Sequence, residues 1–471
     1  EMLEGFSNKG MITVALLFLV SEGIRQSGTL GQVIKKLLPQ GKTTVFKAQL
    51  RILPSVAFIS AFLNNTPVVV IFAPIIKHWA KSVNLPATKF LIPLSYVTIL
   101  GGICTLIGTS TNLVVHGMIL EAGFEGFSMF ELGKVGIFIA IAGIIYIFLF
   151  SKRLLPDARP DTAVPDEEIE EGEKFHRVEA VLGARFPGIN KKLKDFNFQR
   201  HYGAEVKEIK TRNGQRFVSN LEDVVLHEGD TLVVMADDTF IPTWGESSVF
   251  VLLTNGNEPD TTGKKKRWFA LLLLVLMIVG ATVGELPVTK EMFPDIKLDM
   301  FFFVSITTII MAWTNLFPAR KYTKYISWDI LITIACAFAI SKAMVNSGVA
   351  DSVAKFIIGL SDDYGPHVLL AMLFIITNLF TELITNNAAA ALAFPLALSI
   401  ASQLGVSPTP FFVVICMAAS ASFSTPIGYQ TNLIVQGIGN YKFTDFVRIG
   451  LPLNIITFLI SIILIPLIWN F

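Results

Sequence analysis

Long apolar runs recur along this chain, and each is close to the length that a lipid bilayer requires. A helix needs roughly 17–25 mostly apolar residues to cross the hydrocarbon core. Only 16% of the residues are charged, whereas a soluble domain carries about 25%. The sequence therefore predicts an all-α polytopic membrane protein surrounded by lipid. The unbroken runs lie at 9–24, 134–150, 268–284, 300–317, 328–345 and 449–469.

Four further apolar regions are interrupted by polar residues. Regions 90–117 and 409–437 contain polar, glycine-rich stretches, and regions 50–76 and 368–398 are broken by pairs of Asn. Irregular backbone at membrane depth occurs only where it lines a cavity or is buried in protein. We therefore expect the four breaks to carry the function, with 50–76 and 368–398 forming re-entrant hairpins, the first from the cytosol and the second from outside.

The two halves of the chain resemble each other. Residues 5–28 align with 325–348, and residues 105–117 align with 425–437, in both cases 320 positions further along. Between these blocks Asn65 and Pro74 match Asn386 and Pro395 at an offset of 321. Five predicted crossings separate the first block from its copy, and an odd number inverts the copy. Inverted repeats with broken helices are typical of secondary transporters, whose binding site lies between the repeats.

The repeat also predicts that spans precede residue 1. The second copy has two apolar runs, 268–284 and 300–317, ahead of its 328–345 helix, whereas the first copy has none ahead of 9–24. We therefore expect at least two N-terminal spans to be missing.

A soluble module is expected between the repeats, because the composition changes abruptly at 156–267. We expect a short helix through Phe196 and strands at 204–211, 215–219, 231–236 and 248–253, with a hairpin turn at Asn213-Gly214. Basic residues flank the module on both sides, which places it in the cytosol. The predicted units are membrane repeat 1 (1–155), an acidic linker (156–173), the α+β cytosolic domain (174–255) and membrane repeat 2 (264–471).

Hydroxyl and amide side chains recur at matched places in the breaks. The pairs are Ser60/Thr381, Asn64/Thr385, Asn65/Asn386 and Thr66/Asn387, and the other two breaks read Gly108-Thr-Ser-Thr-Asn112 and Gly428-Tyr-Gln-Thr-Asn432. Such oxygens and unwound carbonyls suit Na⁺, and free N–H groups at helix starts suit an anion. None of the breaks contains Arg or Lys. The alternative is that each Asn only caps a helix.

At these positions the chain resembles the divalent anion/sodium symporter family over nearly all of its membrane part. That family carries Ser-Asn-Thr at each of two hairpin tips. The matching residues here are Asn64-Asn65-Thr66 and Thr385-Asn386-Asn387, so the central Asn is kept and the flanking residues differ.

The resemblance implies a homodimer, elevator-type alternating access and at least two Na⁺ ions. One sodium site is implied at Ser60, Asn65 and Gly108, and another at Thr381, Asn386 and Gly428. The implied substrate contacts come from both tips and from one break loop: Asn64, Asn65, Thr66, Thr109, Ser110, Thr111, Thr385, Asn386 and Asn387.

The substrate within that family is carboxylate or sulfate. The motifs Asn-Asn-Thr and Gly-Thr-Ser-Thr-Asn and the inserted module resemble the sulfate-permease branch more closely. We therefore expect sodium-coupled symport of a divalent inorganic anion, sulfate above others, in a bacterial inner membrane. The alternative within the family is a di- or tricarboxylate. The net charge of +1 gives no reason to expect nucleic acid as a partner.

The soluble module resembles the C-terminal lobe of the regulators of K⁺ conductance (TrkA-C type). The residues that carry the resemblance are Phe186-Pro-Gly-Ile-Asn190, Asn197-Phe-Gln-Arg-His-Tyr-Gly203 and Gly229-Asp-Thr-Leu-Val-Val234. Such lobes dimerise, and some bind small nucleotides. Relatives often carry two copies, and one is visible here. The Gly-rich phosphate fingerprint is lacking, so no ligand residues are predicted.

Glu382 is an ionisable residue four positions before Asn386 on an apolar arm. Carboxylates inside the membrane are functional by default, so Glu382 is a candidate coupling group, with a structural hydrogen bond as the alternative. Glu382 would be the coupling residue if the chain were a cation/proton antiporter or a metalloid efflux carrier. A gated channel lacks support because no filter motif is found. The sequence shows no catalytic triad, metal cluster or Walker loop, so an enzyme is not expected.

Overall fold

The computed structural model describes most of the chain, and the following account is confined to those residues. They are 9–157, 175–183, 185–211, 215–237, 240–244, 249–254, 264–293, 297–318, 320, 322–360 and 365–471. Most of the predicted acidic linker and the predicted turn at Asn213-Gly214 lie outside them.

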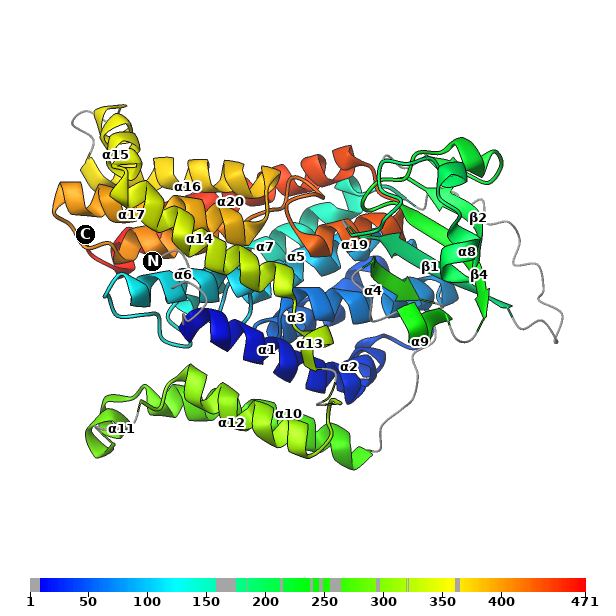
Figure 1. Cartoon of the computed structure of the whole chain (residues 1–471), viewed down its shortest axis with the longest axis horizontal. Helices are drawn as coiled ribbons and strands as arrows, with labels where there is room; N and C mark the ends of the chain where they lie inside the picture. Colours follow the sequence, from blue (N-terminus) through cyan, green and yellow to red (C-terminus); the bar gives the residue numbers. More distant parts are fainter. Residues whose placement is uncertain are drawn as a thin grey trace.

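The membrane part is a bundle of helices in which one order occurs twice (Figure 1). The first series is α1 (Lys9–Gln26), α2 (Thr29–Leu37), α3 (Val45–Ser60), α4 (Asn65–Ser82), α5 (Leu91–Gly102), α6 (Ser110–Glu121) and α7 (Gly133–Leu154). The second series is α14 (Trp328–Asn346), α15 (Val349–Leu360), α16 (Gly365–Leu383), α17 (Asn386–Leu404), α18 (Thr409–Ser420), α19 (Gln430–Gly439) and α20 (Phe443–Ile468).

Other helices precede the second series. They are α10 (Lys264–Gly284), α11 (Pro287–Met292), α12 (Met300–Trp313) and α13 (Tyr322–Tyr325). Both α10 and α12 contact α1, and Lys9 at the start of α1 pairs with Asp299 at the start of α12. By length and composition, five described helices can cross a membrane, or six if the bent pair α14–α15 counts as one span. The chain is therefore largely helical, as the apolar runs predict.

The polar interruptions of the sequence coincide with breaks between helices. The breaks lie between α3 and α4, α5 and α6, α16 and α17, and α18 and α19. Every residue of α5 is buried, and α18 is buried from Pro410 to Ser420, so these two helices lie at the centre of the bundle. Helix α5 can approach α3 closely because position 101 is glycine: a Cβ there would overlap the backbone of Ala57.

Helices α4 and α19 contact each other and extend toward the sheet, whereas α6 and α17 contact each other and extend toward the opposite end (Figure 1). The outer helices α7 and α20 expose apolar side chains such as Ile141, Leu149 and Ile463. In water such surfaces would be costly, but they suit contact with lipid.

The described residues between 175 and 254, in the region predicted to be the soluble module, contain a five-stranded antiparallel sheet in the order β3-β2-β4-β1-β5. The strands are β1 (Phe175–Leu182), β2 (Glu205–Lys210), β3 (Arg216–Phe217), β4 (Thr231–Asp237) and β5 (Phe250–Thr254). Four lie where the sequence predicts them, and β1 was not predicted. The expected helix before Phe196 is only a 3₁₀ turn, Leu193–Asp195, followed by α8 (Phe198–Tyr202), and α9 (Phe240–Trp244) precedes β5.

Candidate functional site

Four helices begin at the centre of the bundle, where side chains from both halves of the chain meet. Helices α4 and α6 start at Asn65 and Ser110, and α17 and α19 start at Asn386 and Gln430. The hydrogen bonds described below connect all four starts. Each helix start carries free N–H groups and the positive end of the helix dipole. Their convergence creates a place that favours negative charge without any basic side chain in the breaks.

The first hairpin tip is organised by Asn65. Its side-chain oxygen accepts a hydrogen bond from Ser60 Oγ at 2.7 Å, and its Nδ2 donates to the hydroxyl of Tyr429 at 2.6 Å. Ser60 and Asn65 are fully buried. Asn65 therefore does not act as a helix cap, because both ends of its amide are engaged by side chains from other turns and from the other half of the chain.

The second tip repeats this arrangement. Thr381 Oγ1 donates to Asn386 Oδ1 at 2.8 Å, as Ser60 does to Asn65, and the side chain of Asn386 lies near the hydroxyl of Tyr429. Thr385 differs: its exposed side chain accepts a hydrogen bond from the backbone N–H of Ala388 at 3.4 Å and caps α17. The capping alternative therefore describes Thr385, but not either central Asn.

Each tip also contacts the broken helix of the other half. Thr66 Oγ1 lies 3.3 Å from Gln430 Oε1, whereas Asn387 Oδ1 accepts from Ser110 Oγ at 3.3 Å and from Thr111 Oγ1 at 3.2 Å. The structure thus brings together most of the predicted substrate residues. Asn64 makes no side-chain capping bond among the described residues, and it lines a small, mostly apolar cavity beside α1 together with Ser110.

An oxygen-rich cradle lies beside the first tip. A Cβ on Gly102 would lie 2.6 Å from Asn65 Oδ1 and 3.1 Å from Gly108 O, and a Cβ on Gly108 would lie 2.5 Å from Gly102 O and 3.0 Å from Ala61 O. Carbonyl and amide oxygens therefore converge where only glycine leaves space. Hard cations prefer such oxygens, and unwound carbonyls coordinate Na⁺ in broken-helix transporters. The residues present fit a sodium ion.

A matching cradle lies beside the second tip. A Cβ on Gly428 would overlap Ser422 Oγ and the carbonyl oxygen of Thr381. Asn432 Nδ2 holds this break by donating to Ser422 O at 2.8 Å and Thr425 O at 3.1 Å. In the first half, Asn112 Nδ2 donates in the same way to Thr105 O at 2.9 Å.

Three residues that hold these breaks are absent from the predicted site residues, although the sequence places them in the paired breaks: Asn112, Asn432 and Tyr429. Asn112 and Asn432 are identical repeat partners, so the repeat could have found them as clamps of the two breaks. Tyr429 left no such signal because its repeat partner is Thr109, a different residue. The two meet in the structure, where their hydroxyl oxygens lie 3.1 Å apart.

Glu382 points away from the tip toward α20. Its Oε1 accepts from the backbone N–H of Ser424 at 2.8 Å and from Asn454 Nδ2 at 2.7 Å. Its Oε2 is buried and has no hydrogen-bond partner among the described residues. The structural alternative for Glu382 therefore rests on observed contacts, while a coupling role stays a prediction.

The largely helical fold, the apolar outer surface and the meeting of broken helices at an oxygen-rich centre together define a membrane transport protein. A family model described as "Citrate transporter" (CitMHS) matches residues 1–405 and 296–470. The chain belongs to this family of transporters, which lies within the divalent anion/Na⁺ symporter superfamily.

Curated relatives cover very different shares of the chain. An uncharacterized transporter of Synechocystis sp. is 30% identical over 100% of this chain and 90% of its own length. Sodium/sulfate cotransporter 2 of Chlamydomonas reinhardtii is 31% identical over 59% of this chain and 31% of its own length. The Na(+)/citrate cotransporter of Rattus norvegicus is 29% identical over 28% of this chain and 23% of its own length.

Proposed function

We propose that this chain is a sodium-coupled symporter of a divalent inorganic anion, with sulfate as its substrate. The observation that carries the proposal is the meeting of four helix starts between two oxygen-rich cradles, with no Arg or Lys in any of the breaks. Helix N–H groups, hydroxyls and amides would hold the anion. The cradles at Asn65/Gly108 and Asn386/Gly428 would hold Na⁺, and two Na⁺ ions would offset a double negative charge.

We also propose that the two helix series are inverted repeats that work by an elevator-type movement in a homodimer. The repeated helix order supports the first part, as does the extension of α4 and α19 toward one end and of α6 and α17 toward the other (Figure 1). An inverted pair offers two equivalent states that expose the site to opposite sides. Regions 50–76 and 368–398 would be its re-entrant hairpins.

Sulfate is expected to outcompete dicarboxylates for the site. Asn64 and Asn387 are bulkier than the Ser and Thr of the usual tip motif, and each amide adds up to two N–H donors. A compact tetrahedral dianion can use such donors on several oxygens. Labelled sulfate uptake into proteoliposomes should be inhibited by thiosulfate and selenate and much less by succinate or malate. Equal inhibition by succinate would assign the carrier to carboxylates, the alternative that the rat relative favours.

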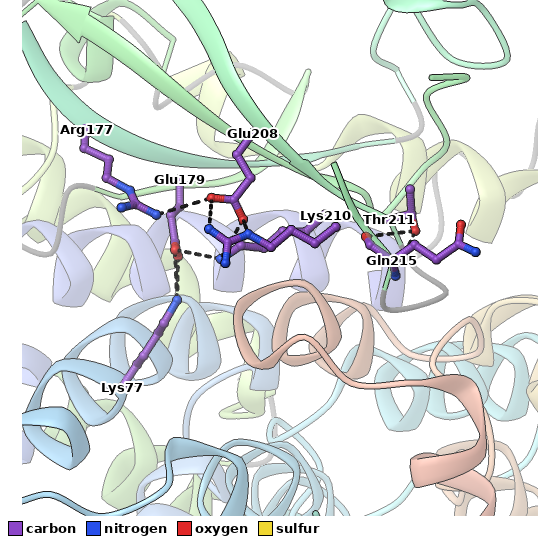
Figure 2. A network of polar contacts seen from close by, with 8 residues as sticks. Lys77, Arg177, Glu179, Glu208, Lys210, Thr211 and Gln215 are labelled. Carbon is purple, nitrogen blue, oxygen red and sulfur yellow. Dashed lines mark hydrogen bonds and ion pairs between the residues drawn. The ribbon is translucent and has the colours of Figure 1, made fainter. Parts of the chain in front are cut away.

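The soluble module would be a cytosolic regulatory lobe. It contacts the ends of α4 and α19 that lie away from the site (Figure 1). Lys77 Nζ on α4 donates to both carboxylate oxygens of Glu179 on β1, each at 2.9 Å (Figure 2). A Cβ on Gly437 of α19 would touch Thr231 Oγ1 at 2.6 Å. A TrkA-C-type lobe with a small-nucleotide ligand remains part of this proposal.

The charge on Glu179 is strongly stabilised. Burial raises the pKa of Glu179, but Lys77 and Lys210 outweigh burial and hold the pKa at about 2, below the ordinary 4.5. The stabilisation is therefore fully present above pH 4.5 and is lost as the pH falls toward 2.

Lys77→Met is expected to loosen the attachment of the lobe by about 2 kcal/mol, since a charge-assisted pair is lost. The lobe itself should stay folded, because Glu179 keeps Lys210, whose Nζ is 3.5 Å away. Hydrogen exchange of β1 and of the loop before β4 should rise in the variant at pH 7. In the unaltered protein it should stay low down to about pH 4.5. Lys35→Met, on the exposed face of α2, is the matched control. Unchanged exchange in Lys77→Met would contradict the docking role.

A further inference from the structure

The side chain of Tyr429 lies where the two hairpin tips approach each other. Its hydroxyl receives the Nδ2 hydrogen bond of Asn65 at 2.6 Å and lies 3.1 Å from Thr109 Oγ1, and the side chain of Asn386 is close by. The residue is 8% exposed. One phenol therefore contacts the central Asn of the first tip and one of the break loops that would bind the anion, and it lies near the central Asn of the second tip.

The repeat shows how unusual this side chain is at its position. Thr109 and Tyr429 are repeat partners that directly precede α6 and α19. Neither side chain makes a capping hydrogen bond to the helix that follows it. The first half thus places a small hydroxyl at the centre, and the second half places a whole aromatic ring there. Because the two hydroxyls meet, the ring occupies space that a second threonine would leave open.

The hydroxyl of Tyr429 is also in a position to take part in anion binding. Asn65 Nδ2 donates a hydrogen bond to this hydroxyl, and an anion oxygen bound beside the hydroxyl could accept a hydrogen bond from the same Nδ2. A phenol O–H is itself a donor that an anion oxygen can accept from. The ring, by contrast, is rigid, and the two rotatable bonds of the tyrosine side chain allow it few alternative positions.

We propose that Tyr429 sets the upper size limit of the transported anion. The ring restricts the space between the tips to a compact oxyanion, while its hydroxyl provides one hydrogen bond to that anion. This inference rests on the proposed function, because it specifies which divalent anions the same site accepts. It adds a restriction by a single residue to the one proposed for the tip amides Asn64 and Asn387.

The test is a graded series at position 429 in the full chain, reconstituted with Na⁺. Tyr429→Thr copies the repeat partner, Tyr429→Leu is intermediate in size, and Tyr429→Phe keeps the ring without the hydroxyl. We expect labelled succinate uptake relative to sulfate to rise about tenfold or more in the Thr variant and less in the Leu variant, since a tenfold change needs only about 1.4 kcal/mol. The Phe variant should still exclude succinate but show a raised KM for sulfate.

The readouts separate this inference from the function on which it rests. An unaltered protein that carries succinate as well as sulfate would overturn both. An unaltered protein selective for sulfate, with the same selectivity in the Thr and Leu variants, would overturn the role of Tyr429 alone. If the Thr variant fails to fold, the Leu and Phe variants still decide: succinate uptake that rises in Phe as much as in Leu would show that ring size is not the determinant.

Discussion

Alanine at Asn65 or at Asn386 should lower sodium-driven uptake by about 10- to 100-fold. Each substitution removes the amide oxygen that accepts from Ser60 or Thr381 and that faces a candidate sodium cradle. The substitution at Asn65 also removes the hydrogen bond to the hydroxyl of Tyr429. A hydrogen bond to a charged group contributes about 1.5–3 kcal/mol, and each 1.4 kcal/mol is about tenfold, so the loss of one such group explains the size of the effect.

The measurement is initial uptake of labelled sulfate into proteoliposomes under an inward sodium gradient, with gel filtration to confirm that each variant is folded. Asn197→Ala is the matched control, since Asn197 caps α8 in the lobe by accepting from Arg200 N at 3.0 Å and lies far from the tips along the chain. It should transport normally. Wild-type uptake in both tip variants would remove these residues from the site.

Alanine at Gly102 or at Gly428 is expected to raise the sodium concentration needed for half-maximal uptake by at least about tenfold. The added methyl group would lie 2.6 Å from Asn65 Oδ1 at position 102 and would overlap Ser422 Oγ and Thr381 O at position 428. At each position the methyl group would either fill the space that a cation would occupy or push the coordinating oxygens out of place. An increase of tenfold corresponds to about 1.4 kcal/mol of lost sodium binding.

The control for this experiment is Gly359→Ala, where a Cβ would meet nothing within 4 Å. The sodium dependence of that variant should match the unaltered protein. Sodium titrations of sulfate uptake would give the result for each variant separately, so the two cradles can be tested independently. If both cradle variants kept the sodium dependence of the unaltered protein, the cations would have to bind elsewhere.

The helix breaks could be predicted from sequence because polar residues inside apolar runs are costly in lipid. This cost does not depend on which other segments the chain contacts. The tip contacts could be predicted only in part. Repeat alignment pairs Ser60 with Thr381 and Asn65 with Asn386, but it does not say that Thr66 meets Gln430 across the two halves. Tyr429 was passed over because a search for identical pairs ignores positions where the halves differ.

The missed strand has a similar physical reason. Strand β1 alternates charged and apolar residues only weakly, and its pairing with both β4 and β5 is a long-range contact that no local pattern reports. The predicted helix before Phe196 failed because the apolar residues there pack into the lobe core from a 3₁₀ turn and a five-residue helix. Phe186, Phe196 and Phe198 form ring contacts within that core.

The attachment of the lobe to α4 and α19 has a consequence for the rate of transport. These two helices come from different halves of the chain, carry tip contacts at one end and are joined through the lobe at the other. The lobe is thus attached to the same two helices that would bind the anion. If those helices move across the membrane as a unit, the lobe must either move with them or dissociate from them once in every transport cycle. A cytosolic signal that strengthens or weakens the contact of the lobe with α4 and α19 would then change the turnover rate without changing the affinity for the anion.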